Sequence, residues 1–236
     1  YYKGFTRAFL AGETESTPEL LDNARNAVNA LAKNKRVILI DGVGFPAVGS
    51  ICGTDNASVA RACRYQTTQQ PPGVLIVGPS GVGNAVDSFN LNATYFSAQD
   101  IPVIGAIFNK LSTDGYYSLD NCRKQVTAYF QQYQPSRKAF GFVPLFPKIA
   151  EDDALEHIDE FIQIFSDHVD VNGIVLAAER VRSMPNKTAE KSPPKKRVKL
   201  EKSAKPHQAM HGKRNRLTIR QRIEQQAVAA GAAPSA

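Results

Sequence analysis

The chain has 236 residues, of which 42% are hydrophobic and 22% are charged. This composition is ordinary for a globular protein and excludes a wholly disordered or collagen-like chain. Its apolar runs are far shorter than the roughly 20 residues that cross a bilayer, and no secretory segment opens the chain, so neither a membrane nor a secreted protein is expected. The three cysteines form no CxxC pair, which argues against a disulfide scaffold or a zinc site.

The net charge of +7 is distributed unevenly along the chain. Residues 181–236 carry fourteen Lys or Arg and three Glu, a balance of +11, which leaves −4 for residues 1–180. The apolar periodicity also stops near Ala178. We therefore predict a folded domain over 1–180 and a disordered basic tail over 181–236, because a segment so rich in Lys, Pro and Ser buries too little apolar surface to offset the entropy of ordering.

Helical periodicity and short apolar runs alternate along the first domain. Helices are predicted at 18–33, 56–63, 84–98, 119–133 and 153–165, and strands at 36–40, 73–77, 102–108 and 139–143. Continuous apolar strands separated by helices are typical of an α/β fold whose mostly parallel sheet is covered by helices on both faces. In such folds ligands bind at the carboxyl ends of the strands.

The first predicted strand ends at Asp41, which Gly42 and Gly44 follow. A carboxylate at the end of a buried strand is where many nucleotide-hydrolysing folds hold a magnesium ion, and the glycines let the backbone approach a ligand. An ordinary polar turn is the alternative interpretation.

The second predicted strand runs into GPSGVGNA at 78–85, which nearly matches the phosphate loop G-x-x-x-x-G-K-[ST]. Asn84 stands where Lys would reach the phosphates, and Ala85 where Ser or Thr would hold magnesium. We therefore do not interpret the segment as a working phosphate loop. The glycine-rich turn of Gly81 and Gly83 leaves a helix N-terminus that can still receive an anionic group.

Two further strand ends carry residues suited to a nucleobase. Asn109 and Lys110 follow the third predicted strand, and an asparagine amide offers both donors and an acceptor to a base edge. The fourth strand runs through Val143 into Pro144, where backbone groups are left exposed. An ordinary turn is the alternative at both positions.

Taken in order, these segments resemble the dethiobiotin synthetase-like branch of the phosphate-loop NTPases over about residues 7–166. The segments that carry the resemblance are VILIDGVG (37–44), VLIV with GVGN (74–77 and 81–84), VIGAIFNK (103–110) and GFVP (141–144). The resemblance implies a three-layer fold that binds ATP and magnesium and acts as a ligase of biotin biosynthesis. That enzyme carboxylates a diamine and closes a ureido ring, and because its relatives are commonly dimers, a homodimer is expected.

The resemblance also implies roles for single residues. Asp41, with Gly42 and Gly44, matches the acidic position that binds magnesium and phosphate. Asn109, with Lys110 beside it, matches the position that contacts adenine. Val143 and Pro144 match the segment that flanks the base. A turn near the substrate and the subunit contact is matched by Gly81, Gly83 and Asn84.

The family's phosphate loop precedes its first helix, and the chain opens at Tyr1 past that point. We therefore expect a fragment that binds ATP poorly, and an ATP-dependent enzyme only if the full protein restores the loop. Two alternatives stay open. One is a non-enzymatic interaction protein that retains the fold, and the other is a nucleic-acid-associated protein whose body is a scaffold.

The tail holds the run PPKKRVKL at 193–200. Four basic residues, Lys195, Lys196, Arg197 and Lys199, follow prolines that keep the segment extended, as a receptor groove that reads basic side chains requires. The run resembles single-cluster nuclear localisation signals, so we expect an import receptor as partner and a location in the nucleus, the cytoplasm or both. Nucleic-acid binding by the tail would be weak, non-specific and sensitive to salt. A solvated basic run is the alternative.

Overall fold

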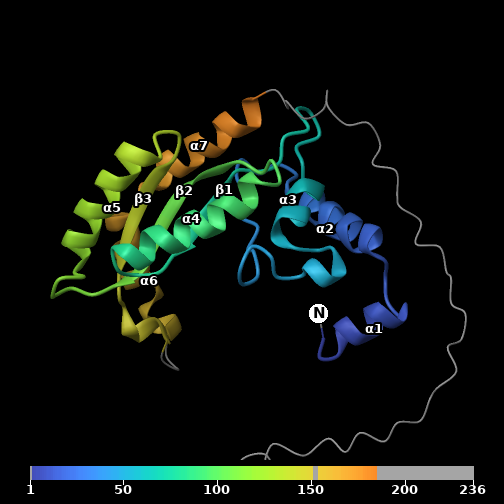
Figure 1. The fold of residues 1–236 in the computed structure, drawn as a ribbon, viewed down its shortest axis with the longest axis horizontal. Helices are drawn as coiled ribbons and strands as arrows, with labels where there is room; N and C mark the ends of the chain where they lie inside the picture. Colours follow the sequence, from blue (N-terminus) through green and yellow to red (C-terminus); the bar gives the residue numbers. More distant parts are fainter. Residues whose placement is uncertain (1, 151–153, 185–236) are drawn as a thin grey trace, which may run out of the picture. The chain divides into compact units, whose positions relative to one another are not determined.

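The computed structural model describes residues 2–150 and 154–184. A parallel sheet lies at its centre, with its three strands in the order β1 (Val74–Gly78), β2 (Val103–Leu111) and β3 (Lys138–Pro144) (Figure 1). The connections between the strands contain α4 (Gly83–Ser97) and α5 (Leu119–Tyr133). The prediction of a mixed α/β fold with parallel strands is therefore confirmed for this region, as are three of the four predicted strands.

Helices cover both faces of the sheet. On one face α4 and α5, together with α3 (Asn56–Ala62), bury a core in which Phe108 of β2 packs between Phe130 and Phe142. On the other face α6 (Ile158–His168) and α7 (Val171–Ser183) cover Ile104, Ile107 and Phe140. Strand β2 and most of β3 are buried on both sides, which explains why their sequences read as continuous apolar runs, whereas Val77 of β1 is exposed.

Two helices precede this core. The elements are α1 (Phe5–Ala11) and α2 (Thr17–Leu31). The N-terminus of α2 is closed by Glu19, whose carboxylate accepts a hydrogen bond from the Ser16 N–H at 2.8 Å. This arrangement satisfies a backbone donor at the helix start. Short 3₁₀ helices lie at Ser50–Cys52, Pro147–Ala150 and Ala154–His157.

The predicted strand at 36–40 is wrong. These residues form no strand, and Leu39 is 91% exposed. Strand propensity largely measures how well a side chain packs against neighbouring strands, and within the described residues this run pairs with none. Its first residue pairs with Glu179 through the Arg36 side chain at 3.0 Å, and three residues beyond its end the Asn56 side chain donates to the carbonyl of Val43.

Other boundaries differ from the sequence predictions in smaller ways. The helix predicted from 153 begins at Ile158, after a 3₁₀ turn. Helices α1 and α7 were not predicted, and α7 continues to Ser183, beyond the expected domain boundary. Its start is fixed by Asp170, whose side chain accepts a hydrogen bond from the Gly173 N–H at 2.8 Å.

No helix in the described ranges is long and apolar enough to cross a membrane. The predicted tail from residue 185 onward, with the basic run at 193–200, lies outside the described residues. The predictions made for that tail therefore stay predictions.

Candidate nucleotide-binding site

Strand β1 ends in the glycine-rich turn that leads to α4. A Cβ on Gly78 would lie 2.9 Å from Cδ1 of Phe108, so the strand end needs glycine in order to pack on β2. Gly81 has a φ of +97°, which favours glycine, and a Cβ on Gly83 would meet nothing within 4 Å. Val82 provides no side-chain cap for α4, so the positive end of the helix dipole faces an open turn.

The turn differs from a phosphate loop at Asn84 and Ala85, and both residues have structural roles of their own. The Asn84 amide donates to the Ser80 carbonyl at 3.3 Å, which closes the turn on itself. The side chain of Ala85 is fully buried in the core, so this position faces the sheet and not a ligand. The structure therefore agrees with the interpretation that the turn is not a working phosphate loop.

Strand β2 ends in a bulge at Asn109 and Lys110. The register between β2 and β3 shifts between Phe108 and Leu111, and Lys110 has a φ of +60°. A left-handed conformation costs a non-glycine residue about 1–2 kcal/mol, and such strain concentrates at functional sites. The Lys110 N–H donates to Oδ1 of Asn109 at 2.8 Å, which holds that side chain in one orientation. Bulges beside active sites commonly redirect side chains in this way.

Strand β3 ends beside this bulge. Pro144 is the register partner of Leu111, and the Leu145 N–H donates to the Leu111 carbonyl at 2.8 Å. Val143 is 1% exposed, so it contributes its backbone and not its side chain to any ligand. The structure thus brings Asn109, Lys110 and Pro144 together at the carboxyl edge of the sheet, where Gly78 is in register with Phe108.

Asp41, Gly42 and Gly44 lie elsewhere, on the exposed segment that replaces the predicted first strand. The expectation that Asp41 ends a buried strand is wrong, because residues 36–40 form no strand. Its carboxylate is exposed and pairs with no basic side chain in the described part of the chain. Gly42 packs near the Asn56 side chain, and Gly44 takes a left-handed φ of +62°.

The described residues hold no preformed cluster of metal ligands, and the expected binding of magnesium at Asp41 stays a prediction. Magnesium is usually held by one or two carboxylates together with waters and substrate phosphates. Within the described ranges no three His, Cys, Asp or Glu side chains lie close enough to hold a metal ion, and Asp41 is a single exposed carboxylate. We therefore derive no chemical step through a metal.

Residue types and conformations were not equally predictable here. The sequence shows the polar Asn109 directly after an apolar run, and this local pattern predicts a polar strand end. The bulge and the left-handed Lys110 were missed, because they arise from the register between two strands that are distant in sequence.

Comparison with models of protein families, with curated proteins and with solved structures gave no significant match in any of the three.

Proposed function

We propose that the domain binds a purine nucleotide at the carboxyl edge of the sheet, as the dethiobiotin synthetase-like resemblance implies. The observation that carries the proposal is the bulge at Asn109 and Lys110, since it combines backbone strain with a fixed polar side chain. An active-site role would explain why this strain is retained.

The base would be held by Asn109. Its Oδ1 accepts from the Lys110 N–H and keeps a second lone pair, so Oδ1 and the two Nδ2 hydrogens remain for a donor and an acceptor on the base. Side-chain amides pair well with adenine, whose edge presents a donor beside an acceptor. The backbone of Val143 and Pro144 lies alongside and would flank the ring.

The phosphates would extend toward the turn of Gly81 and Gly83, at the N-terminus of α4. The helix dipole favours negative charge there, and the exposed Lys110 adds a cation nearby. With Asn84 and Ala85 in place of Lys and Ser or Thr, we expect weak binding and no phosphoryl transfer from these residues. Ligase activity on a diamine is proposed only for a form of the protein that carries a phosphate loop.

Titration calorimetry with adenosine, AMP and ATP tests the proposal. Asn109→Ala should weaken the binding of all three ligands about tenfold, because paired hydrogen bonds to a base contribute roughly 1–3 kcal/mol. The control is Asn23→Ala, which removes the same side chain from an exposed position on α2. Equal affinity of Asn109→Ala and the wild type would contradict the proposal, as would a wild type that binds no nucleotide at millimolar concentration.

A second candidate rests on the tail sequence alone. We propose that the run at 193–200 binds an import receptor and that the domain serves a non-enzymatic interaction in the nucleus. Replacing Lys196 and Arg197 by Ala in the full chain should abolish nuclear accumulation. The matched control replaces Lys213 and Arg214, which lie outside the run. Unchanged nuclear accumulation after the first pair of substitutions would refute this candidate.

A further inference from the structure

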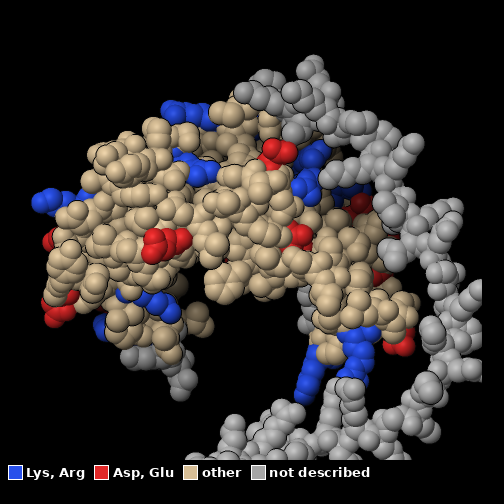
Figure 2. Space-filling view, in the orientation of Figure 1, with Lys and Arg blue, Asp and Glu red and all other residues tan. Residues whose placement is uncertain are grey.

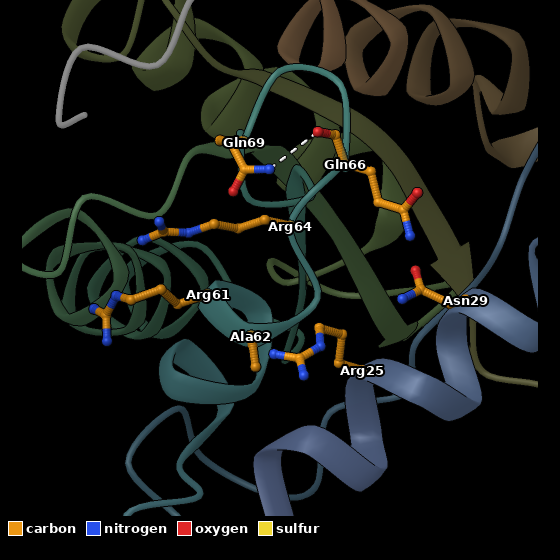
Figure 3. A pocket seen from close by; sticks show the side chains of 7 residues that line it. All are labelled: Arg25, Asn29, Arg61, Ala62, Arg64, Gln66 and Gln69. Atoms are coloured by element: carbon orange, nitrogen blue, oxygen red, sulfur yellow. Dashed lines mark hydrogen bonds between the residues drawn. The ribbon is translucent and has the colours of Figure 1, made fainter. Parts of the chain in front are cut away.

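A basic pocket of about 410 Å³ lies between α2, the end of α3 and the loop that follows it (Figure 3). Its lining residues are Arg25, Asn29, Arg61, Ala62, Arg64, Gln66 and Gln69. Three are arginines, three carry side-chain amides and none is acidic. The loop leads into the start of β1, so the pocket lies toward the amino ends of the strands, away from the candidate nucleotide site.

Arg64 contributes an unsatisfied buried donor to the residues that line the pocket. Its Nε is buried and has no hydrogen-bond partner within the described residues. A buried donor without a partner destabilises the fold, and folded proteins rarely retain one without a reason. Burial lowers the pKa of Arg64, and the nearby charge of Arg61 lowers it further. A bound anion would place negative charge beside the Arg64 guanidinium and offset both effects on its pKa.

The other two arginines are only partly satisfied. Arg61 donates through one nitrogen, at 3.1 Å, to the backbone oxygen and to the side-chain oxygen of Gln99, both of which are neutral. Arg25 pairs with Asp22 at 2.8 Å, but both side chains are about half exposed, and such pairs contribute little. The pocket therefore keeps an excess of positive charge, and Figure 2 shows basic side chains together over α3.

The loop that forms one wall is closed on itself. The Tyr65 N–H donates to the Gln70 carbonyl at 2.9 Å, and the Gln69 N–H donates to the Tyr65 carbonyl at 2.8 Å. Gln69 has a left-handed φ of +58°, and its amide donates to the Gln66 carbonyl at 3.0 Å. Arg182 of α7 lies over the Tyr65 ring at 5.6 Å. A wall held in this way reduces the entropy lost on binding a ligand.

We propose that this pocket binds the phosphate monoester of a small polar molecule, of the sugar phosphate class. Guanidinium groups match phosphate oxygens with several fixed donors, and Arg64 and Arg61 would supply them. The amides of Asn29, Gln66 and Gln69 would meet hydroxyl groups of the ester. The volume is within the range of small-molecule pockets, and no aromatic side chain lines it, so a nucleobase is not favoured.

The test is titration calorimetry of the full chain with glucose 6-phosphate, and with glucose, at constant ionic strength in chloride. We expect binding of the phosphate ester and no binding of glucose. Arg64→Gln and Arg61→Gln should each weaken binding of the ester at least tenfold. The control is Arg123→Gln on α5, which removes the same charge from an exposed site outside the pocket and should leave the affinity unchanged.

Circular dichroism of each variant excludes loss of the fold as a cause. If Arg64→Gln unfolds, Arg61→Gln and Asn29→Ala carry the test alone. Asn109→Ala should bind the ester normally, which separates this pocket from the nucleotide site. Wild-type affinity in both arginine variants would overturn the proposal, as would a wild type that does not bind the ester at 10 mM, a dissociation constant of roughly that size being the weakest binding the proposal allows. An oligonucleotide that binds in place of the ester and is lost in Arg64→Gln would overturn it in favour of a phosphodiester ligand.

Discussion

Two runs of similar residues, VILI at 37–40 and VLIV at 74–77, take different structures in this molecule. The second is strand β1, paired with β2 and buried at Ile76, which is 7% exposed. The first forms no strand, and its Leu39 is 91% exposed. A β-branched run becomes a strand only where a neighbouring strand accepts its hydrogen bonds and a helix covers its face.

The exposed segment continues beyond residue 40. Val43 and Phe45 are 72% and 70% exposed, although the Asn56 side chain holds the carbonyl groups of both. On the sheet itself Val77 is 65% exposed at the outer edge of β1. A contiguous exposed apolar surface is where proteins meet partners or aggregate. Hydrogen bonds hold the backbone of this segment in place, whereas the burial of apolar side chains stabilises the sheet.

Two leucines should differ most strongly in what they contribute to stability. Leu111→Ala, at a position that is 0% exposed, should lower the free energy of unfolding by about 2–5 kcal/mol, because it leaves a cavity in the core. Leu39→Ala should change it by less than about 0.5 kcal/mol. Urea denaturation followed by circular dichroism measures both. A cost above 1 kcal/mol for Leu39→Ala would mean that the segment 37–40 is buried in solution.

Two glycines, Gly141 in β3 and Gly83 at the start of α4, differ in how closely other atoms surround them. In Gly141→Ala the new Cβ would lie 2.6 Å from Cγ2 of Val169 and 2.9 Å from the His168 carbonyl oxygen, so we expect a loss of about 1–3 kcal/mol. Gly83→Ala meets nothing within 4 Å and should be neutral or stabilise the protein by a few tenths of a kcal/mol. Thermal unfolding of both variants gives the comparison, and a destabilised Gly83→Ala would show that the turn is packed.

The same contrast explains which parts of the fold could be predicted. Apolar runs bounded by helices gave three strands, and the periodicity of 119–133 gave α5 with both ends correct. Residues 36–40 carry an equally good strand pattern, and it failed because pairing is not encoded within the run itself. The helix α7 was missed because Gly173 interrupts its pattern, while its start depends on the Asp170 cap.

Some residues of the candidate sites could likewise be predicted from the sequence, and others could not. Asn109 could be singled out because a polar residue at the end of an apolar run is a local signal, and the structure places it near the end of β2. The position of Asp41 was predicted wrongly, since it depended on a strand that does not form. The arginine pocket gave no sequence signal, because Arg25 meets Arg61 and Arg64 only once α2 packs against α3.

A smaller effect concerns the cap that anchors α3 beside the exposed segment. Burial alone would raise the pKa of Asp55, but hydrogen bonds from Ser58, Tyr95 and Ala57 outweigh it, and the pKa is lowered. A lowered pKa means that the charged form stabilises the fold above the unfolded pKa, about 3.9. That contribution is lost as the pH falls through the lower folded value.

Asp55→Asn should therefore cost about 0.5–1.5 kcal/mol at pH 7, because it replaces the charged carboxylate oxygen that accepts the Ser58 hydroxyl, and the cost should stay constant down to about pH 5. Below about pH 4 the difference from the wild type should shrink. Urea denaturation at a series of pH values measures it. A difference that grows as the pH falls would have the wrong sign for a lowered pKa. Asp22→Asn, at an exposed site on α2, is the control and should show little effect.

The smallest expected effect is a gain at the bulge. Lys110 has a φ of +60°, so Lys110→Gly should raise the free energy of unfolding by about 0.5–1 kcal/mol, because glycine takes this conformation without strain. The same substitution at Lys124, inside α5, should cost about 1 kcal/mol through the low helix propensity of glycine. Equilibrium denaturation of both variants gives opposite signs if the bulge is strained. If Lys110 also contacts phosphate, the more stable variant should bind ATP more weakly but adenosine equally well. A variant that gains no stability and binds both ligands normally would show that the bulge is neither strained nor in contact with a ligand, and would remove the reason for assigning function to it.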